Sequence, residues 1–252
     1  PYTYLVATRG YVLSLMGRPA EGHPDRERAA QLAREHADPE LRAYTYTFRV
    51  VHAEIIGDRN AAIRLARRAV ALGERTGIHS SRVLAWHVLA VAHLLHGEYA
   101  DAAIAAAQSL AISRERHTGL QHEAATLAYL AEAQRGLGRL DVARSTADAA
   151  VALAHERGMR FFELQARLSR ARILQAAEGA AARDEITAEI DAAQTLVQAT
   201  GGHSWDPWIR LQRAELATAC GDSDGASRER RTARALFTAM GATGHLRALR
   251  LR

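Results

Sequence analysis

The chain has 252 residues, a formal net charge of +5 and a hydrophobic content of 48%, which together suit a folded domain or a continuous repeat array. All 33 basic residues are arginine, and the absence of lysine excludes a Walker A phosphate loop and a pyridoxal Schiff base, since both need a lysine amine. The single cysteine, Cys220, cannot form an internal disulfide, which favours a reducing, cytoplasmic location.

Glycines mark the ends of the predicted helices in chain order. One set follows apolar segments and recurs every 40 to 42 residues: Gly17, Gly57, Gly97, Gly138, Gly179 and Gly221. A second set ends the segment that follows each turn: Gly77, Gly119, Gly158, Gly201 and Gly241. Glycine suits these positions because it adopts the left-handed conformation that ends a helix. The spacing predicts a helical hairpin that is repeated about six times.

The predicted helices alternate between the first and the second helix of a hairpin. The first helices are expected at residues 3–16, 41–56, 81–96, 121–137, 162–177 and 206–220. The second helices are expected at residues 24–36, 59–76, 99–117, 140–157, 182–200 and 224–240. Arg9, Arg49 and Arg213 stand where the repeat pattern has leucine. Either these helices rotate, or the arginine stems pack while their guanidinium groups reach water.

The third hairpin carries the clearest motif. Its first helix contains Trp86, Leu89 and Ala90, its turn reads Gly97-Glu98-Tyr99, and Ala102 follows in the second helix. This order resembles the tetratricopeptide (TPR) signature. The resemblance implies an all-α, tetratricopeptide-like α-solenoid of about six hairpins in a right-handed superhelix. We expect a single repeat domain over residues 1–252, cut from a larger protein because it begins with Pro1, and a basic C-terminal tail over residues 242–252.

The repeat, at about 40 residues, is longer than the common unit of about 34. With the turn Gly136-Leu137-Gly138 and the ending from Ala233 to Leu246, it resembles the C-terminal repeats of bacterial MalT-like and LuxR-type regulators and of nucleotide-cyclase-linked signalling ATPases. The resemblance implies a bacterial regulatory segment that acts in signal transduction or transcription regulation. It also implies that the ATPase, cyclase and DNA-binding modules lie elsewhere in the parent protein.

In folds of this kind the first helix of each hairpin lines a concave groove, so the resemblance also implies partner-binding residues. The register points nine side chains into this groove: Leu84, His87, Val91 and Leu94 in the third hairpin, Ala128, Glu132 and Arg135 in the fourth, Glu54 in the second and Trp208 in the sixth. A mixed apolar and charged lining suits a peptide or a helix of another protein. The alternative is that the apolar members belong to the core or to a contact with the rest of the parent protein.

No residues with catalytic spacing emerge. His93 and His96 are three residues apart and can reach one metal ion, but no cysteine cluster or acidic partner stands at ligand spacing. Glu185 and Glu189 share a helix face, as many solvated carboxylates do. We therefore predict a chain that is not an enzyme and has neither a metal site nor a cofactor.

Two segments leave alternatives open. Trp205 and Trp208 flank an Asp-Pro turn, and they either anchor a partner or, as we prefer, staple the sixth hairpin onto the fifth. Arginine runs over residues 228–234 and 247–252 either contact phosphates or form a solvated last helix and a frayed tail. We prefer the solvated helix because Glu229 interrupts the first run and no aromatic stacking set accompanies it.

The sequence as a whole favours a protein-interaction and regulatory sensor module that holds a protein, a peptide or another domain of its parent in the groove. A small-molecule effector domain is the first alternative, and an arginine-driven nucleic-acid binder ranks third. We do not expect a membrane span, because the most apolar stretch, residues 83–95, is too short. A homodimer through an exposed terminal face stays open, because the chain lacks an obvious polar cap.

Overall fold

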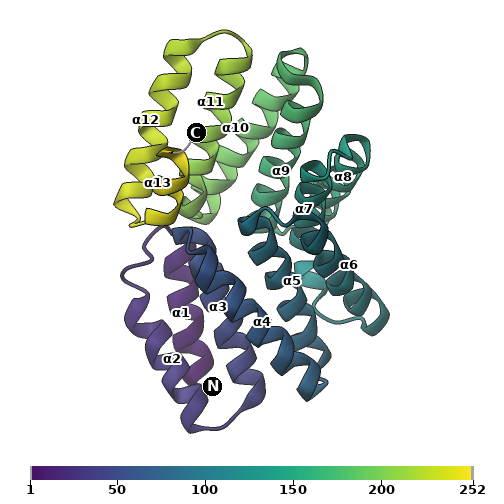
Figure 1. Cartoon of the computed structure of the whole chain (residues 1–252), viewed down its shortest axis with the longest axis vertical. Coiled ribbons are helices and arrows are strands. Elements are labelled where there is room, and N and C mark those ends of the chain that lie inside the picture. Colours follow the sequence, from purple (N-terminus) through teal and green to yellow (C-terminus); the bar gives the residue numbers. More distant parts are fainter. Residues whose placement is uncertain (1, 251–252) are drawn as a thin grey trace. The chain divides into compact units, whose positions relative to one another are not determined.

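A computed structural model describes residues 2–250, and every regular element in this range is helical. The chain divides into two compact units, one of residues 1–120 with 240–252 and one of residues 121–239. Figure 1 shows the helices of both units along the sequence. The expectation of an all-α fold built from helical hairpins is confirmed for the described residues.

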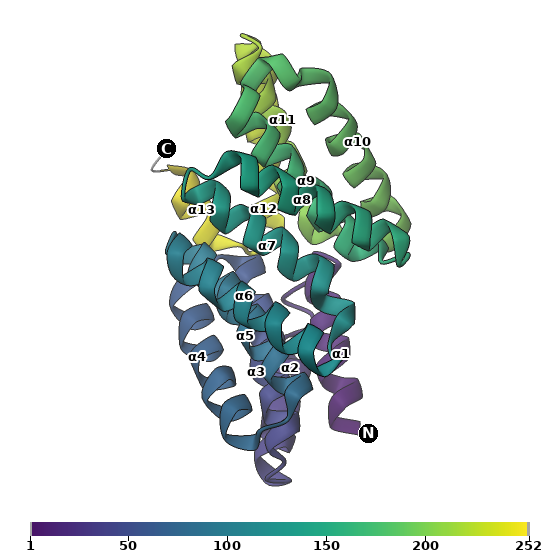
Figure 2. The ribbon, with the colours of Figure 1, turned by 90° about the vertical axis from the view of Figure 1, so that its right-hand side faces the viewer.

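The first unit contains three hairpins and a short helix from the C-terminal end of the chain. Its hairpins are α1 (Tyr2–Leu15) with α2 (His23–Glu35), α3 (Pro39–Ile56) with α4 (Arg59–Thr76), and α5 (His79–His96) with α6 (Tyr99–Arg116). The short helix is α13 (Thr243–Arg250). Figure 2 gives a second view of α3, α4, α5 and α6, whose helices pack side by side.

The second unit contains the other three hairpins. These are α7 (Glu123–Gly136) with α8 (Leu140–Glu156), α9 (Arg160–Glu178) with α10 (Arg183–Thr200), and α11 (Asp206–Ala219) with α12 (Ser223–Ala239). Short 3-10 turns, η2 (Gly179–Ala182) and η3 (His203–Trp205), precede α10 and α11. Each predicted helix is present within two residues at either end.

The turn glycines act as the sequence predicts. Gly57 and Gly97 follow α3 and α5 with φ values of 76° and 78°, in the left-handed region. Their backbone N–H groups donate to carbonyl groups in the last turn of the helix, which would otherwise lack partners. The 40-residue spacing in the sequence therefore reflects the positions at which helices end, in addition to the faces that they bury.

Small residues let the helices of each hairpin approach closely. Ala62, Ala102, Ala143 and Ala226, each five residues after a turn glycine, are buried. In the second unit, Ala131, Ala143 and Ala147 pack with Ile173 in one cluster between α7, α8 and α9. Larger aliphatic side chains fill the space between α9, α10 and α11. The core is thus alanine-rich at the helix crossings and aliphatic between later hairpins.

The arginines at expected leucine positions form ion pairs with a neighbouring helix. Arg49 of α3 lies 3.5 Å from Glu27 of α2, and Arg213 of α11 lies 3.0 Å from Asp191 of α10. In each case the guanidinium group reaches back to the second helix of the preceding hairpin. This arrangement agrees with the expectation that the stem packs and the charged end extends outward.

The C-terminal helix α13 packs against the end of α3. His245 Nε2 lies 2.7 Å from the backbone oxygen of Glu54, and the imidazole is buried. Gly57 and Gly244 meet so closely that a Cβ on Gly244 would lie 2.0 Å from the Gly57 oxygen. Of the basic tail expected over residues 242–252, residues 243–250 are thus helical, whereas residues 251 and 252 lie outside the described range.

Two partly buried histidines, His52 and His122, are expected to make the fold sensitive to acid. Desolvation, with repulsion from Arg26, lowers the pKa of His52 from 6.5 to about 4, and desolvation lowers the pKa of His122 to about 4. The folded chain keeps both imidazoles neutral, so its stability is fully present above pH 6.5 and falls as the pH drops from 6.5 towards 4. Each histidine contributes at most about 1.4 kcal/mol per pH unit in that window.

Urea unfolding at pH 7.5 and pH 5.5, followed by circular dichroism, measures this effect. We expect a lower unfolding midpoint at pH 5.5, and a smaller difference between the two pH values in His122→Gln and His52→Gln. Equal midpoints at both pH values would mean that the two imidazoles are protonated without penalty in the folded chain.

Candidate interaction surface

Three first helices of the second unit contribute to one continuous line of side chains. Glu132 of α7 accepts hydrogen bonds from Arg135 Nε at 2.9 Å and from Arg172 Nη1 at 3.2 Å. The Arg172 guanidinium carbon lies 5.5 Å from the centre of the Trp208 ring on α11. We call this line of Arg135, Glu132, Arg172 and Trp208 the α7–α9–α11 face.

Both tryptophans of the unusual loop pack against the protein. Trp205 and Trp208 are partly buried against the aliphatic cluster of α9, α10 and α11. The Trp208 ring also meets Phe237 of α12 edge-to-face, with ring centres 5.3 Å apart. Asp206 accepts hydrogen bonds from Gln194 of α10 and from His203 of the loop. These two bonds hold the turn between α10 and α11 in place. The loop therefore holds the sixth hairpin onto the fifth, and the Trp208 ring lies beneath the Arg172 guanidinium group.

One carboxylate of the α7–α9–α11 face, Glu132, bonds two guanidinium groups, those of Arg135 and Arg172. The two helices α9 and α11 also carry glutamines, Gln165 and Gln212, whose buried amide nitrogens have no hydrogen-bond partner in the part of the chain that the structure describes. Both amide nitrogens are buried, so they lie in the interior of the unit and not on the surface that a partner reaches. The face itself offers a guanidinium group and an aromatic ring.

Only part of the predicted groove forms this face. Glu132, Arg135 and Trp208 were predicted, and the structure brings them together through Arg172, which the sequence analysis did not assign. The signal for Arg172 was weak because the fifth hairpin departs most from the repeat, with Asp184 in place of the usual alanine.

The predicted residues outside this line differ in exposure. Leu84, His87, Val91 and Ala128 are buried, whereas Glu54 and Leu94 are partly exposed. A buried side chain offers a partner little surface in this conformation. The assignment of these six residues to a partner-binding surface stays a prediction.

The histidines of α5 do not converge on a common point. His93 Nδ1 lies 2.6 Å from Glu98 Oε2, while His96 Nε2 lies 3.0 Å from the backbone oxygen of Arg59. Ligand atoms of His93, Glu98 and Asp101 lie within 4.8 Å of one another, so these three are the residues in this region that have the spacing to hold a cation. Both carboxylates are exposed, and the hydrogen bond between His93 and Glu98 already gives that pair a structural role.

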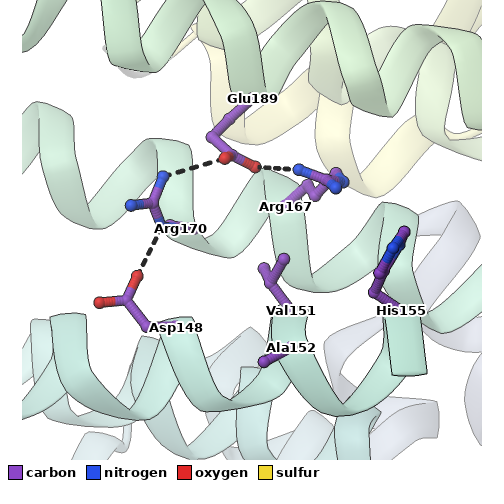
Figure 3. Close-up of a pocket in the computed structure, with 7 residues that line it drawn as sticks. All are labelled: Asp148, Val151, Ala152, His155, Arg167, Arg170 and Glu189. Atoms are coloured by element: carbon purple, nitrogen blue, oxygen red, sulfur yellow. Dashed lines mark hydrogen bonds and ion pairs between the residues drawn. The ribbon is translucent and has the colours of Figure 1, made fainter. Parts of the chain in front are cut away.

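A shallow hollow lies over α8, α9 and α10 (Figure 3). Its volume is about 350 Å³, and it is open to solvent on one side. Val151 and Ala152 of α8 form its apolar part. The polar lining comes from all three helices: Asp148, His155, Arg167, Arg170 and Glu189.

The arginines of the hollow are already paired with carboxylates. Arg170 donates to Asp148 at 2.5 Å, to Glu189 at 2.9 Å and to Glu185. Arg167 donates to Glu189 at 3.0 Å and to Glu163. Burial opposes the charge of Arg170, but its bonds to Asp148 and Glu185 outweigh this effect and raise its pKa. These ion pairs, which we call the α8–α10 network, connect three helices and leave no arginine of the hollow unpaired.

The arginine run of α12 is exposed. Arg228, Arg231 and Arg234 lie on the surface, and Arg230 donates to Thr218 at 3.0 Å. The solvated-helix prediction agrees with this exposure. Phosphate contact by these arginines stays a prediction. The same holds for the second arginine run, residues 247–252.

Stacked antiparallel helix pairs with left-handed glycines at their turns define the class of fold: this chain has a TPR-like, all-α helical repeat fold. The apo form of RapI matches with a TM-score of 0.71 at 11% identity, over 95% of this chain and 83% of that chain. Two structures of nearly identical TPR-like repeats of a putative kinesin light chain from Podosopora anserina, one of them a single-substitution variant, each give a TM-score of 0.51 at 22% identity. They cover 79% and 81% of this chain and 95% and 97% of their own.

These likenesses show the fold alone. No protein-family model and no curated protein matches the chain. Between residues 2 and 250, no helix combines the length and the apolar character that crossing a membrane requires.

Proposed function

We propose that this chain is a non-catalytic interaction and regulatory module that binds a protein or peptide on its α7–α9–α11 face. The observation that carries the proposal is Arg172, which is held between the Glu132 carboxylate and the Trp208 ring. Arginine and tryptophan are the residue types that dominate binding energy at protein interfaces. A guanidinium group that is oriented before binding loses little entropy when a ligand arrives.

The composition of the face indicates the chemistry of the bound segment. The Arg172 guanidinium favours a peptide with a carboxylate, and the Trp208 ring favours an apolar or aromatic side chain beside it.

Peptides selected on the full chain from a random display library provide the probe for a test. We expect Arg172→Ala and Trp208→Ala each to weaken the selected peptides at least tenfold in a fluorescence-anisotropy titration, which corresponds to about 1.4 kcal/mol. Arg213→Ala is the matched control, because Arg213 also lies on α11 and is also paired with a carboxylate, Asp191. It should leave the affinity unchanged.

Two outcomes contradict the proposed site. Selected peptides that bind Arg172→Ala and Trp208→Ala as tightly as the wild type would place the site elsewhere. A library that yields no binder on the wild type, under conditions where the helical content is intact, would contradict peptide binding itself.

The wider setting is part of the proposal. We infer a cytoplasmic module of a bacterial signalling or transcriptional regulator, on the resemblance of the 40-residue repeat to MalT-like, LuxR-type and cyclase-linked proteins. Within such a parent, the bound segment is another domain or a partner protein. A parent gene that encodes an ATPase or cyclase next to these repeats is the expected finding, and a parent without either module contradicts this setting.

A small-molecule effector domain is the second candidate function, because the hollow over α8–α10 has a volume of about 350 Å³, within the range of about 300–1,000 Å³ for ligand pockets. A ligand that binds only the folded chain raises its melting temperature. A thermal-shift screen of metabolites therefore separates the two functions. A shift that is lost in Val151→Trp, which fills the hollow, and kept in Trp208→Ala would favour the effector domain.

A further inference from the structure

The turn between α5 and α6 brings three side chains of metal-binding type together. His93 lies in the last turn of α5, Glu98 directly precedes α6, and Asp101 lies in the first turn of α6. One ligand atom from each of them lies within 4.8 Å of the other two. Ligands held about 2.1 Å from one ion in tetrahedral geometry lie about 3.4 Å apart, so rotation of the two exposed carboxylates is enough to surround an ion.

The imidazole of this group is held in place before any ion arrives. His93 is 8% exposed, and its Nδ1 lies 2.6 Å from Glu98 Oε2. Burial restricts the rotation of the ring, so Nδ1 stays directed towards the turn. A ligand that is oriented by its surroundings loses little entropy when it binds.

Capping of α6 does not account for the two carboxylates. In the second hairpin the acid at the same turn position is a cap, because Asp58 Oδ1 accepts from the backbone N–H of Ala61 at 2.9 Å. Glu98 makes no such bond to α6 and turns towards His93 instead. Asp101 has no hydrogen-bond or ion-pair partner within residues 2–250. Both carboxylates therefore remain available to an ion.

The repeat does not require an imidazole at this position. The residue four positions before the turn glycine is His93 in the third hairpin and leucine, alanine or glutamine in the others: Leu13, Ala53, Gln134, Gln175 and Ala217. Five hairpins therefore form without the histidine. A group that the fold does not need, and that the neighbouring repeats lack, is a candidate for a function of its own.

We propose that His93, Glu98 and Asp101 bind a divalent transition-metal ion of the Zn²⁺ type. One imidazole nitrogen and two carboxylate oxygens suit Zn²⁺, whereas Mg²⁺ and Ca²⁺ prefer oxygen ligands alone. On binding, the ion takes the place of the hydrogen bond between His93 and Glu98, and the imidazole carries its proton on Nε2 in place of Nδ1. Three protein ligands leave a fourth position for water or for a donor atom of a partner.

Calorimetric titration of the full chain with Zn²⁺ tests the proposal, after a chelator has removed metal and with Cys220→Ser to exclude the thiol. We expect one Zn²⁺ per chain, bound at least about tenfold more weakly in Asp101→Asn and in His93→Gln. His93→Gln is expected to fold, because the fourth and fifth hairpins have glutamine at this position. Asp141→Asn is the matched control, because it removes an exposed carboxylate from the first turn of α8 and should leave the affinity unchanged.

Imidazole NMR locates the ion independently. Long-range ¹H–¹⁵N spectra report which ring nitrogen carries the proton, and the signals of His93 are those that His93→Gln lacks. We expect Zn²⁺ to move this proton from Nδ1 to Nε2, and an excess of Mg²⁺ to leave the spectrum unchanged. A wild type that binds no Zn²⁺, an Asp101→Asn chain that binds it as tightly as the wild type, or a His93 spectrum that Zn²⁺ leaves unchanged would overturn the proposal.

Discussion

Arg170→Ala is expected to lower the free energy of unfolding by about 3 kcal/mol. The side chain is 16% exposed and donates to Asp148 on α8 and to Glu185 and Glu189 on α10. Its removal leaves these carboxylates close together, and Glu189 is nearly buried. The estimate lies at the lower end for a disrupted buried ion pair, because Asp148 and Glu185 are partly exposed.

Urea unfolding at pH 7.5 measures this change. Arg170→Lys is expected to recover less than half of the loss, because an ammonium group lacks the planar fork that reaches two helices at once. Arg18→Ala, which breaks an exposed pair with Glu21, is the control and should leave the urea midpoint unchanged. If Arg170→Ala matches Arg18→Ala, the α8–α10 network does not hold the helices together.

Gly57→Ala is expected to destabilise the chain by about 3 kcal/mol, more than the same change at Gly97. The two glycines occupy equivalent turns, with φ values of 76° and 78°. At Gly97 a Cβ meets nothing within 4 Å, so the change adds only backbone strain of about 1 kcal/mol. At Gly57 a Cβ would lie 2.5 Å from the backbone nitrogen of His245, so α13 must also move.

The difference between the two variants isolates the contact of α13 with α3. Urea midpoints give the energies, and hydrogen exchange of residues 243–250 reports whether α13 stays in place. We expect faster exchange there in Gly57→Ala and no change in Gly97→Ala. Equal stability losses in the two variants would mean that α13 contributes nothing to the first unit.

The hairpins were predictable from sequence because their signal is local. Left-handed glycines at a fixed spacing mark where most of the helices end, and the residues between two such glycines leave room for one helix. Helix α13 was expected only as a tail, because its docking depends on Gly244 meeting Gly57, which is 187 positions earlier in the chain. Contacts over such a separation leave no periodic pattern in the sequence.

The candidate site was predictable only where the register is regular. Glu132 and Arg135 follow from the fourth hairpin, whose turn repeats the motif of the third. Arg172 and the α8–α10 network were missed because charged residues on a helix resemble a solvated face until the neighbouring helix is known. The buried positions of His87 and Val91 were also hidden, since first-helix register alone does not say how deep a residue lies.

An arginine-only composition suits this architecture. Arg170 uses three of its guanidinium and Nε donors on two neighbouring helices, and Arg172 bonds Glu132 while its flat face meets Trp208. Lysine offers neither the fork nor the planar surface. Alanine side chains make many of the helix crossings. Arginine–carboxylate bonds between hairpins therefore help to fix how neighbouring helices are oriented.

Hydrogen exchange with a selected peptide bound tests the central claim most directly. The proposed site predicts slower exchange in the first helices of the second unit, at residues 123–136, 160–178 and 206–219, and a loss of that protection in Arg172→Ala. Protection confined to the second helices, at residues 140–156, 183–200 and 223–239, would contradict binding on the α7–α9–α11 face.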